Sequence, residues 1–356
     1  MKASEWVKTL PDRIRLGDQA GFDALSKRDD AILQAVKNRN IVVDWMPVIT
    51  HSGGRTAQFW VMMSPLEVGE VGDSIIVNTG ERNQQMIADE LQSVLPTELL
   101  GDEIYAQADV KLPTLTQGWW QDGSMADTSR MVEYDAIVKK AIAGRKGLVG
   151  NAGKYWLIHP KLQLAANRQK AVNYGWYQPA NPPGLGDKYP TAVPGMTAIQ
   201  APLTGHTWLH TDYSQVVTLV SRTVYICEPA DQWVGAERDG ANGLPCTMAD
   251  GSQGITRVAD IYEMIDDPEL KPLFVKNINK SLNTMRHPGV PWPGGQPTPA
   301  PFVPPDPVPP NPGPGPGPGP GPAPRIAGLS SAGKVAAVGL GLAAGYTLLD
   351  WWRRRS

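Results

Sequence analysis

Ala171-Val172-Asn173-Tyr174-Gly175-Trp176-Tyr177 is a run of aromatic and β-branched residues, which β-strands favour. Similar runs stand at Lys154-Tyr155-Trp156-Leu157-Ile158-His159 and at Val216-Val217-Thr218-Leu219-Val220, and residues 223–226 continue the last one. From these runs we predict a largely antiparallel sheet after residue 145.

Before residue 145 the sequence has helical patterns instead. Ser26 and Asp29 resemble a capping box, which predicts a helix that contains Ile32, Ala35 and Val36. Apolar stripes predict two more helices, one through Ile87, Leu91, Val94 and Leu95 to Pro96 and one over residues 129–142, ended at Gly144. Short strands are expected at 41–43, 58–62 and 75–77, with a turn at 51–54. The predicted fold class is therefore α+β, with N-terminal helices and short strands followed by a mainly antiparallel sheet.

The prolines divide the chain into three parts. Seventeen of its 34 prolines lie between Pro291 and Pro324. We therefore predict a globular module over residues 1–290, with room for two subdomains that meet near residue 145. Residues 291–325 are predicted to form an extended Pro/Gly stalk, which leaves residues 326–356 as a separate C-terminal segment.

The C-terminal segment is predicted to be a hydrophobic helix that anchors the chain in a membrane. Residues 335–349 carry no charge, and a helix over residues 326–352 would be about 40 Å long, enough to cross a hydrocarbon core of about 30 Å. Trp351 and Trp352 match an interfacial aromatic belt, and Arg353 to Arg355 match a cytoplasmic flank. Gly341 and Gly345 form a GxxxG pattern, which favours self-association of such helices. A helix packed on the module or on another subunit is the alternative.

The side of the membrane that carries the module stays open. The basic tail places the module outside the cytoplasm, whereas the N-terminus, Met1 to Trp6, has no apolar signal sequence. A tail-anchored cytoplasmic protein, a protein exported by a dedicated route and a component of a phage particle or lysis event all fit this pattern.

The net charge and the cysteine content give limited information about partners. The net charge is −2, from 33 Lys and Arg against 35 Asp and Glu, which argues against a general phosphate-binding surface. Nucleic acid is therefore not an expected partner. The two cysteines, Cys227 and Cys246, fit either a disulfide or two thiols.

The polar cluster Gly205-His206-Thr207-Trp208-Leu209-His210-Thr211-Asp212-Tyr213-Ser214-Gln215 contains two of the five histidines. If it is a strand, His206, His210 and Asp212 face the same way. His210 and Asp212 would then be close enough to share a zinc ion, whereas His206 would join them only if the chain bends. As a helix, the segment would instead bring the two histidines together. The sequence on either side favours a strand.

Three chemical roles remain open for this cluster. A zinc site would use His206, His210 and Asp212 with His159 as a further ligand, or His51 after it, and would support a metal-assisted hydrolase of the cell envelope. Alternatively, His210 acts as an acid or base oriented by Asp212, with Tyr213 or Ser214 beside it. The third reading is a structural hydrogen-bond network.

Aromatic residues indicate a second candidate surface. Trp119 and Trp120 lie in a polar loop, and Tyr174 and Tyr177 lie in a predicted strand that runs into prolines. Exposed aromatic side chains often bind sugars or proteins, so these four residues are the predicted ligand-binding set. Core packing is expected instead for Trp156 and Trp176.

Several motifs together resemble a group of bacterial and phage-type proteins that has no established activity. The resemblance rests on Asn173-Tyr174-Gly175-Trp176 and on the HxxxHxDYSQ pattern from His206 to Gln215, and also on the segments 28–32 and 129–133. It covers residues 25 to 290 and leaves the tail outside. It implies no function.

The sequence therefore predicts a membrane-tethered binding protein that presents its module, on a stalk, to an envelope polymer or a partner protein. Two alternatives are the metal-assisted hydrolase and a phage particle or scaffold component. Whether the protein is an enzyme is left open, and zinc is the cofactor that the hydrolase would require.

Overall fold

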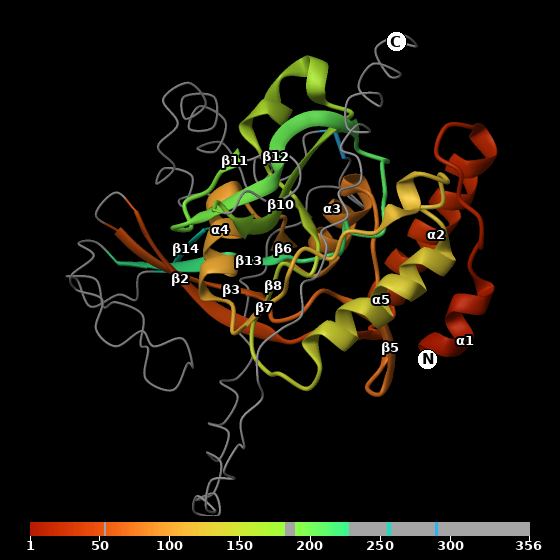
Figure 1. The fold of residues 1–356 in the computed structure, drawn as a ribbon, viewed down its shortest axis with the longest axis horizontal. Helices are drawn as coiled ribbons and strands as arrows, with labels where there is room; N and C mark the ends of the chain where they lie inside the picture. The colour runs from red at the N-terminus through yellow and green to blue at the C-terminus, as the bar shows by residue number, and fades with distance from the viewer. Residues whose placement is uncertain (53–54, 182–188, 228–254, 258–288, 291–356) are drawn as a thin grey trace, which may run out of the picture. The chain divides into compact units, whose positions relative to one another are not determined.

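The structure, a computed structural model, describes residues 1–52, 55–181, 189–227, 255–257 and 289–290 (Figure 1). These residues belong to one compact unit and combine helices with antiparallel sheets, which confirms the α+β class. The stalk, the C-terminal segment and Cys246 lie outside the described residues.

The largest sheet joins distant parts of the sequence. Its strand order is β14-β13-β3-β2, all neighbours are antiparallel, and β6 also pairs with β13. Because β3 pairs with β13, this sheet joins residues from both sides of residue 145. The strands are β2 (Trp45–Ser52), β3 (Arg55–Met62), β6 (Ser93–Val94), β13 (Val220–Cys227) and β14 (Ile255–Arg257).

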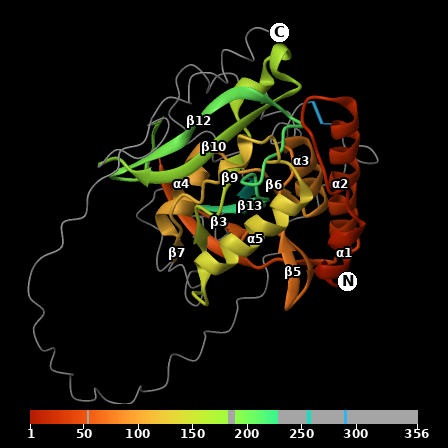
Figure 2. The same ribbon diagram turned by 45° about the vertical axis from the view of Figure 1, so that its right-hand side comes forward.

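A second antiparallel sheet has the order β11-β12-β10-β9 and includes the two longest strands. Figure 2 shows β10 and β12 as a curved ribbon pair above α5. The strands are β9 (Lys154–Trp156), β10 (Lys170–Pro179), β11 (Tyr189–Pro190) and β12 (Met196–Thr207). The predicted strands at 154–159 and 171–177 are thus confirmed, although β9 is shorter than expected.

Two small sheets complete the described strands. One is antiparallel with the order β1-β4-β5, and the other is the parallel pair β7-β8. Their strands are β1 (Ile41–Val42), β4 (Glu67–Glu70), β5 (Asp73–Ile76), β7 (Val110–Lys111) and β8 (Val149–Gly150).

The described α-helices are α1 (Ala3–Trp6), α2 (Gln19–Lys37), α3 (Glu81–Glu90), α4 (Glu98–Gln107) and α5 (Thr128–Ile142). The described 3-10 turns are η1 (Val7–Thr9), η2 (Gly118–Trp120), η3 (Pro160–Gln163) and η4 (Ala165–Asn167). The prediction of α5 is confirmed; after Ile142, Ala143 adopts a left-handed conformation that ends the helix. The helix predicted around Ile32 exists, but it starts at Gln19, where the Asp18 side chain accepts the N–H of Gly21.

The helix predicted to run up to Pro96 is shorter in the structure. α3 ends at Glu90, and Gln92 has a φ of 51°, which turns the chain out of the helix. Val94, expected on the helical stripe, instead lies in β6 and pairs with Val220. Strand pairing with a segment more than a hundred residues away has therefore overridden the local pattern.

The strand expected at 216–220 is also mostly absent from the structure. Val216 forms an isolated bridge with Asn78, and β13 begins only at Val220. The backbone of this segment bonds to neighbouring loops, since the Leu66 N–H donates to the Val217 carbonyl. The segment is buried, which explains its apolar sequence.

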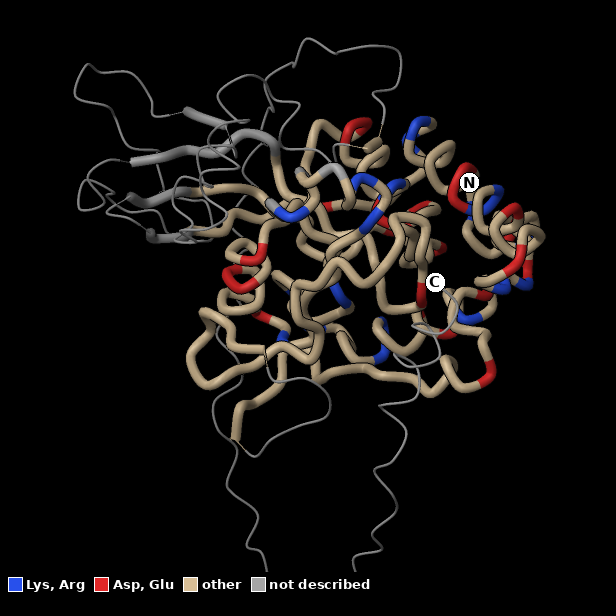
Figure 3. Tube along the Cα trace, turned by 90° about the horizontal axis from the view of Figure 1, so that it is seen from above, with Lys and Arg blue, Asp and Glu red and all other residues tan. Residues whose placement is uncertain are grey.

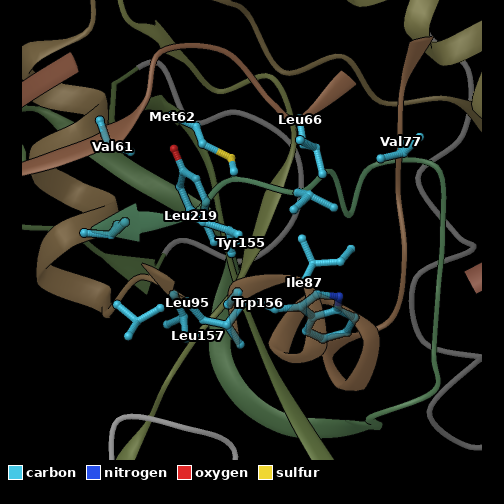
Figure 4. Close-up of a cluster of buried hydrophobic side chains, with 14 of the residues drawn as sticks. Val61, Met62, Leu66, Val77, Ile87, Leu95, Tyr155, Trp156, Leu157 and Leu219 are labelled. Atoms are coloured by element: carbon cyan, nitrogen blue, oxygen red, sulfur yellow. The ribbon is translucent and has the colours of Figure 1, made fainter. Parts of the chain in front are cut away.

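The main core lies between the sheets and α2, α3 and α4. Trp156 is fully buried in it beside Ile87, as Figure 4 shows. Trp176 is buried in a neighbouring cluster, so both tryptophans expected in the core are found there.

Acidic and basic residues are scattered over the described chain, with both signs near the N-terminus (Figure 3). Within the described ranges, no helix is long and apolar enough to cross a membrane.

Candidate functional site

The chain bends after His206 instead of continuing as a strand. β12 ends at Thr207, and the N–H of His210 donates to the Thr207 carbonyl, which closes a turn. The bend stacks the imidazoles of His206 and His210, with ring centroids 4.3 Å apart and planes 24° from parallel. The prediction of a straight strand with distant histidines is therefore wrong, because the turn shortens the path.

Residues 208–215, here called the histidine loop, are fixed on the N-terminus of α3. The N–H of Arg82 donates to the Trp208 carbonyl, which caps a helix end that has no side-chain cap. Gly80 makes this approach feasible, because a Cβ at position 80 would lie 2.8 Å from the Trp208 carbonyl oxygen. Thr79 contributes a second backbone bond, from its N–H to the carbonyl of Gln215.

Buried amide side chains hold the other end of the histidine loop. Gln84 Nε2 donates to the Gln215 carbonyl at 2.9 Å, and Asn78 Nδ2 donates to the Asp212 carbonyl. The Gln215 side chain in turn accepts the N–H of Asp212 at 2.8 Å. All of these side chains are almost completely buried, so the loop is built into the interior rather than laid on the surface.

Asp212 forms a buried ion pair below the histidines. Lys154 Nζ lies 2.9 Å from Asp212 Oδ2, and both residues are more than nine-tenths buried. The other oxygen, Oδ1, accepts the N–H and the hydroxyl of Ser214. Each carboxylate oxygen thus has a donor, as a buried charge requires. His210 Nε2 lies 3.9 Å from Oδ2, beyond hydrogen-bond distance.

Both imidazoles are neutral at neutral pH. Burial, with smaller effects of His210 and Lys154, lowers the pKa of His206 to about 3. Burial lowers the pKa of His210 to about 4, although Asp212 opposes the change. Burial would raise the pKa of Asp212, but Lys154, His210 and Ser214 outweigh it and hold the pKa at about 2. The site therefore combines a permanent ion pair with two uncharged rings.

The histidines remain reachable from solvent. The His210 side chain is 20% exposed, and His206 is half-buried. Behind them, the Trp156 ring lies 5.9 Å from His206 and 6.5 Å from His210, edge to face in both cases. The indole N–H of Trp156 donates to the Thr79 carbonyl at 3.0 Å. The pair thus forms an accessible aromatic face on a rigid base, here called the His206–His210 face.

Tyr213, predicted to act beside His210, has a different role. Its hydroxyl accepts the N–H of Gln117 at 2.7 Å and donates to the Gln117 carbonyl at 3.0 Å. Its ring packs against Trp119, with centroids 4.8 Å apart. The tyrosine therefore fixes the loop that carries Trp119. Ser214 is fully buried and bonded to Asp212, so neither hydroxyl is placed as a nucleophile.

The predicted zinc ligands are not assembled in this structure. Among the described residues, no group of three His, Cys, Asp or Glu side chains is placed to hold a metal ion. His210 and Asp212 are close together, but the Lys154 ammonium already occupies the carboxylate. His159 Nδ1 accepts the N–H of Lys161 and caps η3, and His51 lies in β2. The metal hypothesis thus stays a prediction without an assembled ligand set.

The predicted aromatic ligand set is divided. Tyr174 and Tyr177 are buried, and both hydroxyls donate to Asp102 Oδ1, at 2.6 and 2.9 Å. They belong to the core, contrary to the prediction, because Asp102 satisfies their polar ends. Trp119 is half-buried under the Arg130 guanidinium, 4.9 Å from its ring. Trp120 is 42% exposed and alone keeps the exposure that the prediction required.

Sequence reasoning missed several residues of the site. Lys154 was assigned to a strand without a role, because its partner lies 58 residues away. Glu81 also escaped notice: it is fully buried on the first turn of α3, and burial raises its pKa well above the usual range. The Asn78-Thr79-Gly80 turn could have suggested the start of a helix, since its glycine and polar residues precede an apolar stripe. Its glycine could also have suggested that another segment packs closely against that helix end.

The chain matches no family model, no curated protein and no solved structure.

Proposed function

We propose that the chain is a membrane-tethered binding protein whose ligand, an envelope polymer, contacts the His206–His210 face. The observation that carries the proposal is the solvent-reachable stack of two neutral imidazoles above a buried ion pair. Neutral imidazoles each offer one donor and one acceptor, and their rings offer a stacking surface.

The Lys154–Asp212 ion pair is better explained by a role in ligand binding than by a role in stability. A buried Lys–Asp pair is weak evidence for stabilisation, because desolvation offsets the attraction. Here the pair lies directly beside the histidines and links β9 to the histidine loop. Rigid support of this kind fixes the orientation of contact residues before the ligand arrives, which lowers the entropic cost of binding.

The stalk and the C-terminal segment are part of the same proposal. The uncharged segment over residues 335–349, extended to 326–352 with Lys334 and Asp350 near its ends, and the basic tail after it support a membrane anchor. The Pro/Gly stalk supports display of the module away from the bilayer. A neutral binding face on such a module suits a polymer of the envelope, on whichever side of the membrane the module lies.

Co-sedimentation with isolated envelope material tests the proposal. Full-length protein is mixed with insoluble envelope fragments, and the bound fraction is compared for wild type, His206→Ala and His210→Ala. The matched control is Leu203→Ala, which changes an exposed side chain on the same strand as His206. We expect both histidine variants to lose most binding and the control to keep it. Equal binding by all four proteins would refute the proposal.

A hydrolase is the second candidate function. The observation that favours it is the separation of 3.9 Å between His210 Nε2 and Asp212 Oδ2, which a small side-chain rotation would convert into an oriented acid–base pair. Because the Tyr213 and Ser214 hydroxyls are already bonded to Gln117 and Asp212, a water molecule would attack the substrate. Release of soluble fragments from the envelope material by wild type, but not by His210→Ala, would support this candidate over simple binding.

A further inference from the structure

The chain returns to the histidine loop immediately before its proline-rich segment begins. Gly289 packs against the Arg168 backbone and the Trp208 ring: a Cβ at position 289 would overlap the Arg168 carbonyl oxygen and would lie 2.8 Å from Cζ3 of Trp208. Only a residue without a side chain allows so close an approach. The next residue, Val290, is 3% exposed. The chain is therefore packed beside the histidine loop up to the residue that precedes Pro291.

Trp208 stands between the two histidines of the His206–His210 face in the sequence, two residues from each. Two residues of extended chain span at most about 7 Å. The Trp208 N–H donates to the Gln169 carbonyl at 3.0 Å, which extends the β10–β12 ladder by one bond and fixes the backbone at this point. Residues 291–293 can extend over about 9 Å, at about 3.1 Å per residue. They are therefore long enough to pass from the Gly289 contact to both imidazoles.

From this arrangement we propose that Pro291-Trp292-Pro293 docks on the His206–His210 face of its own chain. The docking needs no other molecule. Its consequence, a competition with the envelope polymer for the same face, rests on the proposed function.

The two surfaces match in their chemistry. Proline-rich segments favour the polyproline II helix, which makes no internal hydrogen bonds, and such helices bind surfaces lined with aromatic rings. The face supplies two stacked imidazoles with the Trp156 ring beside His206. Each neutral imidazole has one N–H that can donate to a backbone carbonyl of the segment. The proline rings and the Trp292 indole supply the apolar contact.

The charges also match. Residues 291–305 contain no charged side chain, and at the face the Lys154 ammonium is already paired with Asp212. Neither surface therefore has to give up the hydration of an unpaired charge when the two meet.

The covalent link makes this segment an effective occupant. A site and a segment joined by a short linker meet at an effective concentration of millimolar order. A segment that binds with a Kd of about 1 mM as a free peptide would thus cover the face about half of the time. An envelope polymer has to displace it, so its apparent affinity is about twofold lower than for an uncovered face.

Histidine NMR of full-length protein at pH 7 tests the docking. The first variant carries Pro291→Gly, Trp292→Gly and Pro293→Gly. The matched control carries Pro314→Gly, Pro316→Gly and Pro318→Gly, which lie farther along the chain. We expect the imidazole signals of His206 and His210 to shift in the first variant and to keep their wild-type positions in the control. Wild-type positions in both proteins would overturn the proposal.

A synthetic peptide of residues 291–301 provides the second measurement. Added to the first variant, it should move both imidazole signals back toward their wild-type positions with a Kd of about 1 mM or tighter. The same peptide with the three glycine changes should have no effect. Failure of the unchanged peptide to move these signals overturns the proposal. Wild-type signals that depend on protein concentration would mean that the segment docks on a second copy, which overturns docking within one chain.

Co-sedimentation with envelope fragments separates this proposal from the proposed function. If the NMR signals shift as expected but no protein binds the envelope, the docking stands and the proposed function fails. If wild type binds the envelope but the signals do not shift, the function stands and the docking is overturned. If both hold, the first variant should bind the fragments about twofold more tightly than the control. Equal binding would overturn the competition.

Discussion

Acidification from pH 7 to pH 5 should destabilise the protein through His206 and His210. Both folded pKa values lie below the ordinary value of 6.5, at about 3 and about 4, so the folded state binds fewer protons than the unfolded state. Stability is therefore fully present above pH 6.5 and falls as the pH decreases toward the folded pKa values. Over this interval each histidine should cost up to about 2 kcal/mol, or about 4 kcal/mol for the pair.

The measurement is urea unfolding of full-length protein at pH 7 and pH 5, for wild type and for His206→Gln with His210→Gln. Comparison with the variant is essential, because burial raises the pKa of Asp29 to about 6, despite the opposing charge of Arg28. That carboxyl stabilises the fold as the pH falls below 6 and so opposes the histidines. Its effect is common to both proteins and cancels in the difference. Asp212 adds nothing here, since its contribution is lost only between about pH 4 and its pKa of about 2.

We expect wild type to lose about 4 kcal/mol more than the double variant between the two pH values. A single variant, His210→Gln, should remove about half of this difference. If wild type and the double variant show the same pH dependence, the histidines are solvated like those of a peptide, and the description of the site as two partly buried, neutral rings is refuted.

Three further predictions concern the support of the site. Gly80→Ala adds a Cβ 2.8 Å from the Trp208 carbonyl oxygen on an unstrained backbone, so it should displace the histidine loop and cost about 1–3 kcal/mol; hydrogen exchange of residues 208–215 measures the displacement, and unchanged protection would contradict it. Lys154→Met leaves Asp212 buried without its cation and should cost about 3–5 kcal/mol in urea unfolding, whereas a second change, Asp212→Leu, should restore much of the loss; a double variant no more stable than the single one would count against the ion pair. Asp102→Ala removes the acceptor of two tyrosine hydroxyls and a backbone N–H, and neither His206 nor His210 is among these partners. It should lower stability by about 1–3 kcal/mol without changing the histidine titration, which NMR can follow.

Local patterns predicted the elements whose stability is local. α5 carries Met131, Tyr134 and Val138 on one buried face and ends where Ala143 turns left-handed, so its sequence period and its structure agree. The aromatic and β-branched run predicts β10 in the same way, and the structure buries this run through the middle of the strand. α4 was not predicted, although Thr97 caps it by accepting the N–H of Leu100.

The errors came from contacts between distant segments. Val94 satisfies a helical stripe in the sequence, yet it pairs with Val220 in the sheet. The same holds for the site: His206, His210 and Asp212 stood out because they are neighbours in the sequence. Lys154 did not stand out, because it meets Asp212 only when β9 packs against the histidine loop, 58 residues away in the sequence. Their stacked arrangement depends on a turn after Thr207 that alternation of side chains cannot reveal.

A histidine NMR titration of full-length protein, without and with soluble envelope fragments, tests most directly whether His206 and His210 form a neutral binding face. We predict that the imidazole signals of His206 and His210 report neutral rings from pH 8 down to pH 5, and that both shift when fragments are added at pH 7. Signals that titrate near the ordinary pKa of about 6.5, or that ignore the fragments while other residues respond, would contradict it.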